Sequence, residues 1–302
     1  MKCLVTGGAG FIGSHVVDKL VDLGHDIVVI DNLFTGLKEN INPKAKFVKI
    51  SINSDLNDIF EKEKPEFVFH LAAQANLRKS FENPAMDAKI NVGGSLNIID
   101  CCVRYKVKKL IFSSTAALYS PNVDLPCSEK DEASPMSPYG LTKLTVEKYL
   151  KIMKDYHGLD YAALRYSNVF GPRQNPLGEA GVVCVFMDKI SNGQDIMING
   201  DGEQTRDFIF VADVADANVQ AMAKGVNGIF NVSSEQETSI NYLAETLKNI
   251  SGNNINISHG EGIKGELRRS CLSNEKLKKT GWNNNTGFED GLKVTYESFA
   301  KK

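Results

Sequence analysis

A tyrosine and a lysine lie four residues apart, at Tyr139 and Lys143, within the stretch Pro138–His157, which has the apolar periodicity of a helix. Because four residues make about one helical turn, both side chains share one face of that helix. A phenol with a pKa of about 10 is a poor base near neutral pH, but a neighbouring ammonium lowers that pKa. Tyr139 is therefore a candidate proton acceptor and donor. Taken alone, such a pair is more often a solvated helix face, so the hypothesis depends on what surrounds it.

A run of hydroxyl side chains, Ser113-Ser114-Thr115, closes a predicted strand that begins at Lys109. In an open parallel sheet, the carboxyl ends of the strands face the crevice in which ligands bind. The hydroxyl of Thr115, or of a neighbouring serine, is therefore a candidate to bind the substrate oxygen that Tyr139 would deprotonate.

Three glycines with the spacing G-x-x-G-x-x-G, at Gly7, Gly10 and Gly13, follow the first predicted strand and open the first predicted helix. Glycines in such a turn let backbone N–H groups approach a dinucleotide pyrophosphate, and the helix N-terminus adds partial positive charge. Asp31 ends the second predicted strand, where a carboxylate hydrogen-bonds a ribose diol and repels a 2′-phosphate. The pattern predicts a bound dinucleotide and favours NAD over NADP.

The elements that must position these residues alternate along the first half of the chain. Short, nearly continuous apolar runs are separated by helical patterns, which indicates βαβ units around a parallel sheet that is covered on both faces. The predicted strands are Lys2–Thr6, Asp26–Ile30, Lys46–Ile50, Phe67–Leu71, Lys109–Ser113 and Tyr161–Arg165, and the predicted helices are Phe11–Leu23, Asp55–Glu61, Met86–Tyr105 and Pro138–His157.

Beyond residue 167 the sequence becomes richer in Gly and Asn, which is typical of long loops. Helices are predicted there over 211–224, 239–251 and 274–281, with short strands at 196–198, 207–210 and 228–232. We therefore predict an α/β fold: a Rossmann-type, doubly wound parallel sheet with a smaller C-terminal α/β substrate-binding lobe. Residues 1–167 are expected to form the dinucleotide-binding domain and 168–302 mainly the substrate lobe, with segments of about 207–232 crossing back.

The composition is that of an ordinary globular protein: 42% of the 302 residues are apolar and 24% are charged, with a formal net charge of −2. That charge gives no reason to expect a nucleic-acid partner, and no apolar run approaches the length of a membrane span. The six cysteines include no C-x-x-C pair and the five histidines show no ligand spacing, so no metal site and no disulfide framework is expected. Met1 and Lys2 lead directly into a predicted strand without a targeting segment, and we expect a cytoplasmic protein.

The ordered motifs along nearly the whole chain resemble those of extended short-chain dehydrogenases/reductases, specifically the NAD-dependent epimerase/dehydratase family. Within this family, the chain is most similar to the members that epimerise UDP-glucose at C4. The matching segments are Thr6–Gly13, Asp31-Asn32, His70–Gln74, Asn91–Gly94, Ser113–Tyr119, the pair Tyr139-x-x-x-Lys143, Leu164–Gly171 and Thr205–Phe208.

The resemblance implies a catalytic triad of Thr115, Tyr139 and Lys143, with Lys143 also bonded to the nicotinamide ribose. Besides this tyrosine and lysine, the residues implied to bind NAD are Gly7, Gly10, Phe11, Ile12, Gly13, Asp31, Asn32, Thr35, Gly36, Ser51, Ile52, Leu71, Ala72 and Ala73. Ser51 and Ile52 stand where relatives often have an aspartate that contacts the adenine, so that contact is expected to be lost or supplied differently here.

For the substrate, the resemblance implies a UDP-sugar whose diphosphate is held by Asn168 and Arg206. A second cation for the phosphates is Arg268 or Arg269, of which we favour Arg268, although a solvated basic pair explains these two residues nearly as well. Ser270 corresponds to the position that borders the C2 substituent of the sugar. Because serine is small, N-acetylated hexoses are expected to be accepted as well as glucose and galactose.

The reaction implied is C4 epimerisation by transient oxidation to a 4-keto sugar. Related dehydratases place acidic residues directly after the catalytic hydroxyl, whereas this chain has Ala116 and Ala117 there, and alanine cannot protonate a leaving hydroxyl. The alternatives are epimerisation of UDP-glucuronate, another nucleotide-sugar oxidoreductase, and, in a different class, a non-catalytic NAD-binding regulator. Relatives often form homodimers through the helices that correspond to Met86–Tyr105 and Pro138–Met153, although both helices would also simply cover the sheet.

Overall fold

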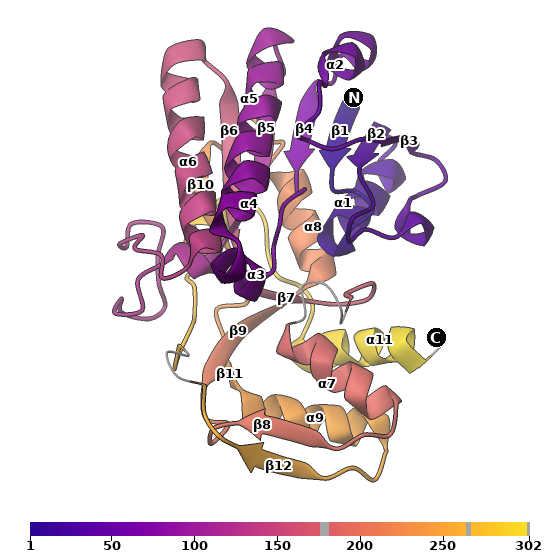
Figure 1. Cartoon of the computed structure of the whole chain (residues 1–302), viewed down its shortest axis with the longest axis vertical. Coiled ribbons are helices and arrows are strands. Elements are labelled where there is room, and N and C mark those ends of the chain that lie inside the picture. The colour runs from indigo at the N-terminus through magenta and orange to yellow at the C-terminus, as the bar shows by residue number, and fades with distance from the viewer. Residues whose placement is uncertain (176–180, 264–266, 301–302) are drawn as a thin grey trace.

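The computed structural model of the chain describes residues 1–175, 181–263 and 267–300. Its centre is a seven-stranded sheet with the order β10-β6-β5-β4-β1-β2-β3, in which every neighbouring pair is parallel (Figure 1). The strands are β1 (Lys2–Thr6), β2 (Asp26–Asp31), β3 (Lys46–Lys49), β4 (Phe67–His70), β5 (Lys109–Thr115), β6 (Asp160–Tyr166) and β10 (Gly228–Val232). The predicted doubly wound α/β fold is confirmed.

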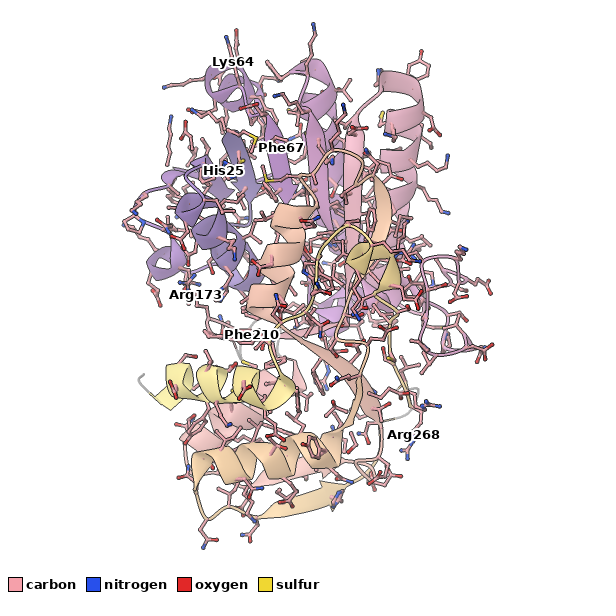
Figure 2. All side chains as sticks on the ribbon, turned by 180° about the vertical axis from the view of Figure 1, so that it is seen from behind. His25, Lys64, Phe67, Arg173, Phe210 and Arg268 are labelled. Carbon is pink, nitrogen blue, oxygen red and sulfur yellow. The ribbon has the colours of Figure 1, made fainter. Side chains whose placement is uncertain are left out.

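Alternate residues of each strand face opposite sides of this sheet, and both sides are covered. In β1, Cys3 and Val5 belong to the core that contains α1 (Phe11–Asp22) and α8 (Val211–Gln220). Leu4 belongs to the core on the other side, built with α2 (Asn57–Glu63), α5 (Gly94–Arg104) and α6 (Pro138–His157). In Figure 1 the side of the sheet with α5 and α6 faces the viewer. Figure 2 shows the molecule from behind, so that the side with α1 and α8 faces the viewer. Burial on both sides explains why runs such as Cys3–Val5, Ile27–Ile30 and Phe67–Phe69 are continuously apolar.

The single helix predicted over Met86–Tyr105 is interrupted. After the short α3 (Leu77–Glu82), α4 (Pro84–Ala88) begins with the side chain of Asn83 accepting the Met86 N–H over 2.9 Å. A π-helical turn over Lys89–Gly93 then joins α4 to α5. Such turns are inserted residues within an otherwise α-helical run, which a periodicity of 3.6 does not reveal.

A smaller lobe lies below the carboxyl ends of the sheet strands in Figure 1. Its own core contains side chains from α7 (Val182–Ser191), α9 (Ile240–Ser251) and α11 (Phe288–Ala300). Two small sheets complete it: β7 (Asn168–Phe170), β9 (Thr205–Phe210) and β11 (Glu237–Ser239), and the pair β8 (Ile196–Asn199) and β12 (Ile257–Gly260). A short α10 (Glu275–Lys278) follows β12.

Two segments of the second half return to the larger sheet. Helix α8 packs on α1, and β10 pairs with β6.

All six cysteines are buried free thiols. Within the described residues, no helix combines the length and apolar character that crossing a membrane requires. Nor do three His, Cys, Asp or Glu side chains of this part of the chain converge in a way that would hold a metal ion.

Candidate active site

A cavity of about 260 Å³ lies where the strands of the large sheet end. It is formed by the glycine turn after β1, the end of β4, the end of β5, the first turns of α6 and the segment from β6 into β7. The predicted site residues that line it are Gly7, Gly10, Phe11, Ile12, Gly13, Leu71, Ala73, Thr115, Tyr139, Lys143 and Asn168. Predicted residues from five separate parts of the sequence are thus brought to one cavity.

The glycine turn leaves no room for side chains. Gly7 has φ +71°, and a Cβ there would lie 2.7 Å from the Ala72 nitrogen. A Cβ at Gly13 would lie 2.1 Å from the carbonyl oxygen of Gly7, so the start of α1 packs directly on the turn. Gly10 precedes α1 without any side-chain cap, which leaves the N–H groups of the first helical turn at the cavity. This cradle fits a pyrophosphate.

Asp31, the last residue of β2, holds the glycine turn that follows β1. One carboxylate oxygen accepts the N–H of Ala9 over 3.1 Å and the other accepts the N–H of Leu33 over 2.8 Å. Gly36 packs against the same turn, since a Cβ there would lie 3.0 Å from atoms of Ala9. The side chain of Asn32 accepts the N–H of Phe34 over 3.0 Å. Asp31 and Gly36 therefore adjoin the cradle, but none of Asp31, Asn32, Thr35 and Gly36 lines the 260 Å³ cavity.

Ser51 and Ile52 are not brought to the cavity either. The Ile52 side chain is buried in the core beside α5, and a Cβ at Gly94 would lie 2.5 Å from its Cδ1. Its carbonyl oxygen accepts a hydrogen bond of 2.8 Å from the side chain of Asn97. The Ser51 hydroxyl accepts the N–H of Asn53 over 3.2 Å.

The end of β4 is held by a buried histidine. His70 is in hydrogen-bond contact with the hydroxyls of Thr6, 2.7 Å from Nδ1, and Ser95, 2.8 Å from Nε2. Ser95 donates its own proton to the carbonyl of Asn91 over 2.5 Å, so it accepts from Nε2–H while Nδ1 accepts from Thr6. Thr6 in turn accepts the N–H of Leu71. Burial, reinforced by the charge of Lys143, lowers the pKa of His70 to about 3, which keeps the imidazole neutral.

Thr115, Tyr139 and Lys143 come from two adjoining elements. Strand β5 runs past its predicted end at Ser113, so that Thr115 terminates it, and the Thr115 hydroxyl accepts the N–H of Ala117 over 3.1 Å. Lys143 is buried and its Nζ donates to the Ser113 carbonyl over 2.8 Å. The same Nζ lies 5.9 Å from the centroid of the Tyr139 ring. A cation at this position favours the phenolate form of Tyr139.

The start of helix α6 is fixed by the residues that cap it. The Ser137 hydroxyl accepts the N–H of Gly140 over 3.1 Å, and Pro138 occupies the first helical position, where its missing N–H costs no hydrogen bond. Gly140 allows the helix to touch the short turn that follows β5, because a Cβ there would lie 2.5 Å from the carbonyl oxygen of Ala117 in that turn. The start of the helix and the turn directly after the strand are thus in direct contact.

The predicted cations for the phosphates do not line the cavity. Arg206 is half-buried on β9, and its Nη1 donates to the carbonyl of Thr205 over 2.8 Å. Arg268 lies at the outer edge of the smaller lobe (Figure 2), where it forms a two-pronged ion pair with Asp201 at 2.7 and 2.9 Å. That pairing lowers the pKa of Asp201 to about 2. Arg269 pairs with Glu237 instead.

Ser270 is half-buried and likewise lies outside the cavity lining. Sequence reasoning missed several lining residues, among them Tyr166, Gln174, Val182 and Phe208. Tyr166 ends β6, so the rule that strand ends face the ligand would have found it. Phe208 ends the matching segment Thr205–Phe208, which could have pointed to it, whereas Gln174 and Val182 carry no motif that would have identified them.

The comparisons with known proteins agree with this geometry. Residues 3–233 match the family described as the NAD dependent epimerase/dehydratase family. The crystal structure of UDP-glucose 4-epimerase from Thermotoga maritima with UDP-glucose is 46% identical, with a TM-score of 0.97 over 100% of this chain and 99% of that one.

Two further proteins are similar over nearly their whole length. UDP-glucose 4-epimerase of Mycolicibacterium smegmatis is 37% identical over 311 residues, which are 100% of this chain and 99% of that protein. UDP-N-acetylglucosamine 4-epimerase from Methanobrevibacter ruminantium, solved with UDP-N-acetylmuramic acid, is 37% identical with a TM-score of 0.95 over 99% of this chain and 98% of that one. The glycine cradle, the Tyr-Lys pair and these matches lead to one conclusion: the chain is an enzyme of the NAD-dependent epimerase/dehydratase family.

Proposed function

We propose that this enzyme interconverts UDP-galactose and UDP-glucose by epimerisation at C4. The observation that carries the proposal is the single cavity that joins the glycine cradle to Thr115, Tyr139 and Lys143. A dinucleotide in the cradle and a sugar against the tyrosine would meet inside this cavity. The similarity to 4-epimerases over the whole chain supports the same reaction.

The chain's residues fit NAD as the cofactor. Gly7, Gly10 and Gly13 and the start of α1 would hold the pyrophosphate, and Asp31 would meet the adenosine ribose. When bound, NAD would supply a reversible two-electron oxidation at C4 of the hexose, so that the overall reaction has no net redox change. Lys143 would bond the nicotinamide ribose.

Tyr139 would take the proton of the C4 hydroxyl and later return it, which is the work of a general base and acid. The Lys143 ammonium, buried 5.9 Å from the ring, supports this by favouring the phenolate. Thr115, at the end of β5, would bind the same sugar oxygen. The hexose must also be free to turn over between oxidation and reduction, which requires that the nucleotide part be held more firmly than the sugar.

Asn168, Arg206 and Arg268 would hold the diphosphate. Asn168 lines the cavity. Arg268 would have to leave Asp201 first, and because both side chains of that ion pair are 59% exposed, the exchange costs little. Phosphates offer the planar guanidinium the same two-pronged contact that Asp201 does.

The residues after Thr115 favour epimerisation over elimination. Ala116 and Ala117 form the start of a short 3₁₀ turn, Ala116–Leu118, at the place where a dehydratase needs an acid. Neither side chain can protonate a leaving hydroxyl. Epimerisation requires no such acid.

The substrate range is proposed to include UDP-GlcNAc and UDP-GalNAc. Ser270 is small, and the relative from Methanobrevibacter ruminantium is a UDP-N-acetylglucosamine 4-epimerase. The test is to incubate the purified chain separately with UDP-galactose, UDP-GalNAc and UDP-galacturonate and to identify products by NMR. We expect UDP-glucose and UDP-GlcNAc. Turnover of UDP-galacturonate alone would replace the proposal with the uronate 4-epimerase, and no turnover of any sugar would refute it.

We also propose a homodimer. Apolar side chains follow one exposed stripe of α6: Leu141, Tyr149, Ile152 and Tyr156. Leu77 and Phe81 of α3, which contacts α6, are exposed as well. Exposed apolar side chains gathered on two neighbouring helices are typical of an interface with a second copy. Six buried free thiols support work in a reducing compartment, and we propose the cytoplasm.

A further inference from the structure

Asp207 of β9 is a fully buried carboxylate that collects hydrogen bonds from three distant segments. One oxygen accepts the hydroxyl of Ser167 at 3.2 Å and both the N–H and the hydroxyl of Ser234, at 2.9 and 2.8 Å. The other oxygen accepts the N–H of Leu272 at 3.1 Å and that of Glu235 at 3.3 Å.

Two of the three anchored segments, and Asp207 itself, adjoin a residue proposed to bind the substrate. Ser167 immediately precedes Asn168, Leu272 follows Ser270 by two positions, and Arg206 immediately precedes Asp207 itself. Residues 167, 207 and 272 are far apart in sequence, yet this carboxylate joins them through direct bonds. Asp207 does not line the cavity, so it would act on the substrate only through these neighbours.

A carboxylate is chemically suited to this position and an amide is not. Two carboxylate oxygens offer about four lone pairs and no proton, whereas the asparagine side chain presents an NH₂ on one side. With five donors converging, that NH₂ would face N–H or O–H groups and leave them without partners. Burial raises the pKa of Asp207, because the charged carboxylate is less stable in the protein interior than in water. The hydrogen bonds from the three segments stabilise the carboxylate and lower its pKa in turn.

We propose that Asp207 is a positioning residue that sets Asn168 and Arg206 in register to bind the diphosphate of the UDP-sugar and holds the segment of Ser270 beside the sugar. This inference rests on the proposed function. Lys143 and Thr115 are held by other contacts: Lys143 donates to the Ser113 carbonyl of β5, and Thr115 caps the turn that follows that strand. The role of Asp207 is therefore expected in substrate affinity and not in the chemical step.

The test compares Asp207→Asn with Asp213→Asn. Asp213 is a matched control, because it is also buried, its pKa is also raised by burial, and its carboxylate also accepts backbone N–H groups. Its partners, however, are the N–H groups of Asn285 at 2.9 Å and Thr286 at 3.2 Å, in a C-terminal segment that carries none of the residues proposed to bind the substrate. The measurements are kcat and KM for UDP-galactose, the affinities for UDP and NAD by calorimetry, and the melting temperature.

For Asp207→Asn we expect KM for UDP-galactose and Kd for UDP to rise about tenfold, with kcat and NAD affinity changed less than about threefold. Asp213→Asn is expected to lower the melting temperature while leaving KM and Kd unchanged. If Asp207→Asn does not fold, Ser234→Ala, which removes one bond of the carboxylate, is expected to raise Kd for UDP about twofold to threefold.

Equal KM values in wild type and Asp207→Asn, or the same rise in both aspartate variants, would overturn the positioning role. A wild-type chain without activity on any UDP-sugar would instead refute the proposed function, and the affinity for UDP would still decide the role of Asp207. The two failures are thus distinguished by different measurements.

Discussion

The ammonium of Lys143 donates a hydrogen bond to the carbonyl oxygen of Ser113 over 2.8 Å. This bond joins the start of α6, which carries Tyr139, to the end of β5, which carries Thr115. The lysine side chain is only 3% exposed, so its charge acts on the tyrosine without much screening by water. This hydrogen bond ties the helix to the strand and fixes the position of the ammonium charge.

Replacing Tyr139 by Phe removes the proposed proton acceptor while keeping the ring. We expect kcat for UDP-galactose to fall about a thousandfold, in the range typical of general acid–base groups, with NAD affinity retained. Tyr156→Phe, at the exposed end of the same helix, serves as the control and should leave kcat unchanged. A Tyr139→Phe variant that keeps more than about a tenth of wild-type kcat would contradict the assigned role.

Replacing Gly140 by Ala is expected to separate α6 from β5. The new Cβ would lie 2.5 Å from the Ala117 carbonyl oxygen and 2.9 Å from Cβ of Pro135, and backbone cannot yield as a flexible side chain does. We expect kcat to fall at least about tenfold, because a small displacement of catalytic groups is costly. In the control Gly93→Ala, where the nearest atom is 3.8 Å away, steady-state kinetics should be unchanged. Equal activity of both variants would show that the contact is unimportant.

His70 is expected to make the free energy of unfolding decrease as the pH falls. Its pKa is lowered to about 3 in the folded chain, whereas the unfolded chain binds its proton near pH 6.5. Above pH 6.5 both states are neutral and the full stability is present; as pH falls from there, the unfolded state gains the proton and stability is lost. The slope from this residue approaches about 1.4 kcal/mol per pH unit.

Urea unfolding of the wild type and His70→Gln between pH 7.5 and 5.5 measures this slope. The variant should be less stable at pH 7.5 but less sensitive to acid. Burial also lowers the pKa of His15, so some sensitivity of the same sign should remain in the variant. Identical slopes in the two proteins would show that His70 does not titrate as described.

Ser270 tests the substrate range. A tyrosine at this position is expected to reduce turnover of UDP-GalNAc about a hundredfold while UDP-galactose stays within about threefold, because only the N-acetyl group needs the added space. Ser270→Ala, which stays small, should accept both sugars. The comparison is made as kcat/KM for each sugar. If Ser270→Tyr lowers both values alike, Ser270 does not border the C2 substituent.

The proposed dimer depends on the α6 stripe. Ile152 is 58% exposed in the monomer, and Ile152→Glu would place a charge in an apolar interface. Light scattering should give the dimer mass for the wild type and for Ile152→Leu, and the monomer mass for Ile152→Glu. A wild-type monomer at micromolar concentration would refute the dimer.

Sequence reasoning predicted the residues whose geometry is local. Tyr139 and Lys143 share a helix turn, and Thr115 ends a strand, so i,i+4 spacing and the strand-end rule suffice to bring them together. The glycine spacing likewise depends on a single turn. All of these residues are among the predicted ones that the structure gathers around the cavity.

The rest depends on contacts between distant segments. Helix α7 begins with an almost wholly apolar stretch, Val182–Met187, which periodicity alone does not separate from a buried strand. Arg268 was selected for its charge, but its partner Asp201 is 67 positions away and lies in another loop. No local pattern identifies such a pairing. The same is true of Asp207, whose five bonds reach segments before and after it.

The most direct test of C4 epimerisation follows the hydrogen atom at C4. Purified enzyme is incubated with UDP-galactose that carries deuterium at C4, in ordinary water, and the product is analysed by NMR and mass spectrometry. Because oxidation and reduction are proposed to occur within one closed cycle, the UDP-glucose formed should keep its deuterium at C4. Product in which solvent hydrogen has replaced that deuterium, or no UDP-glucose at all, would contradict the proposed reaction.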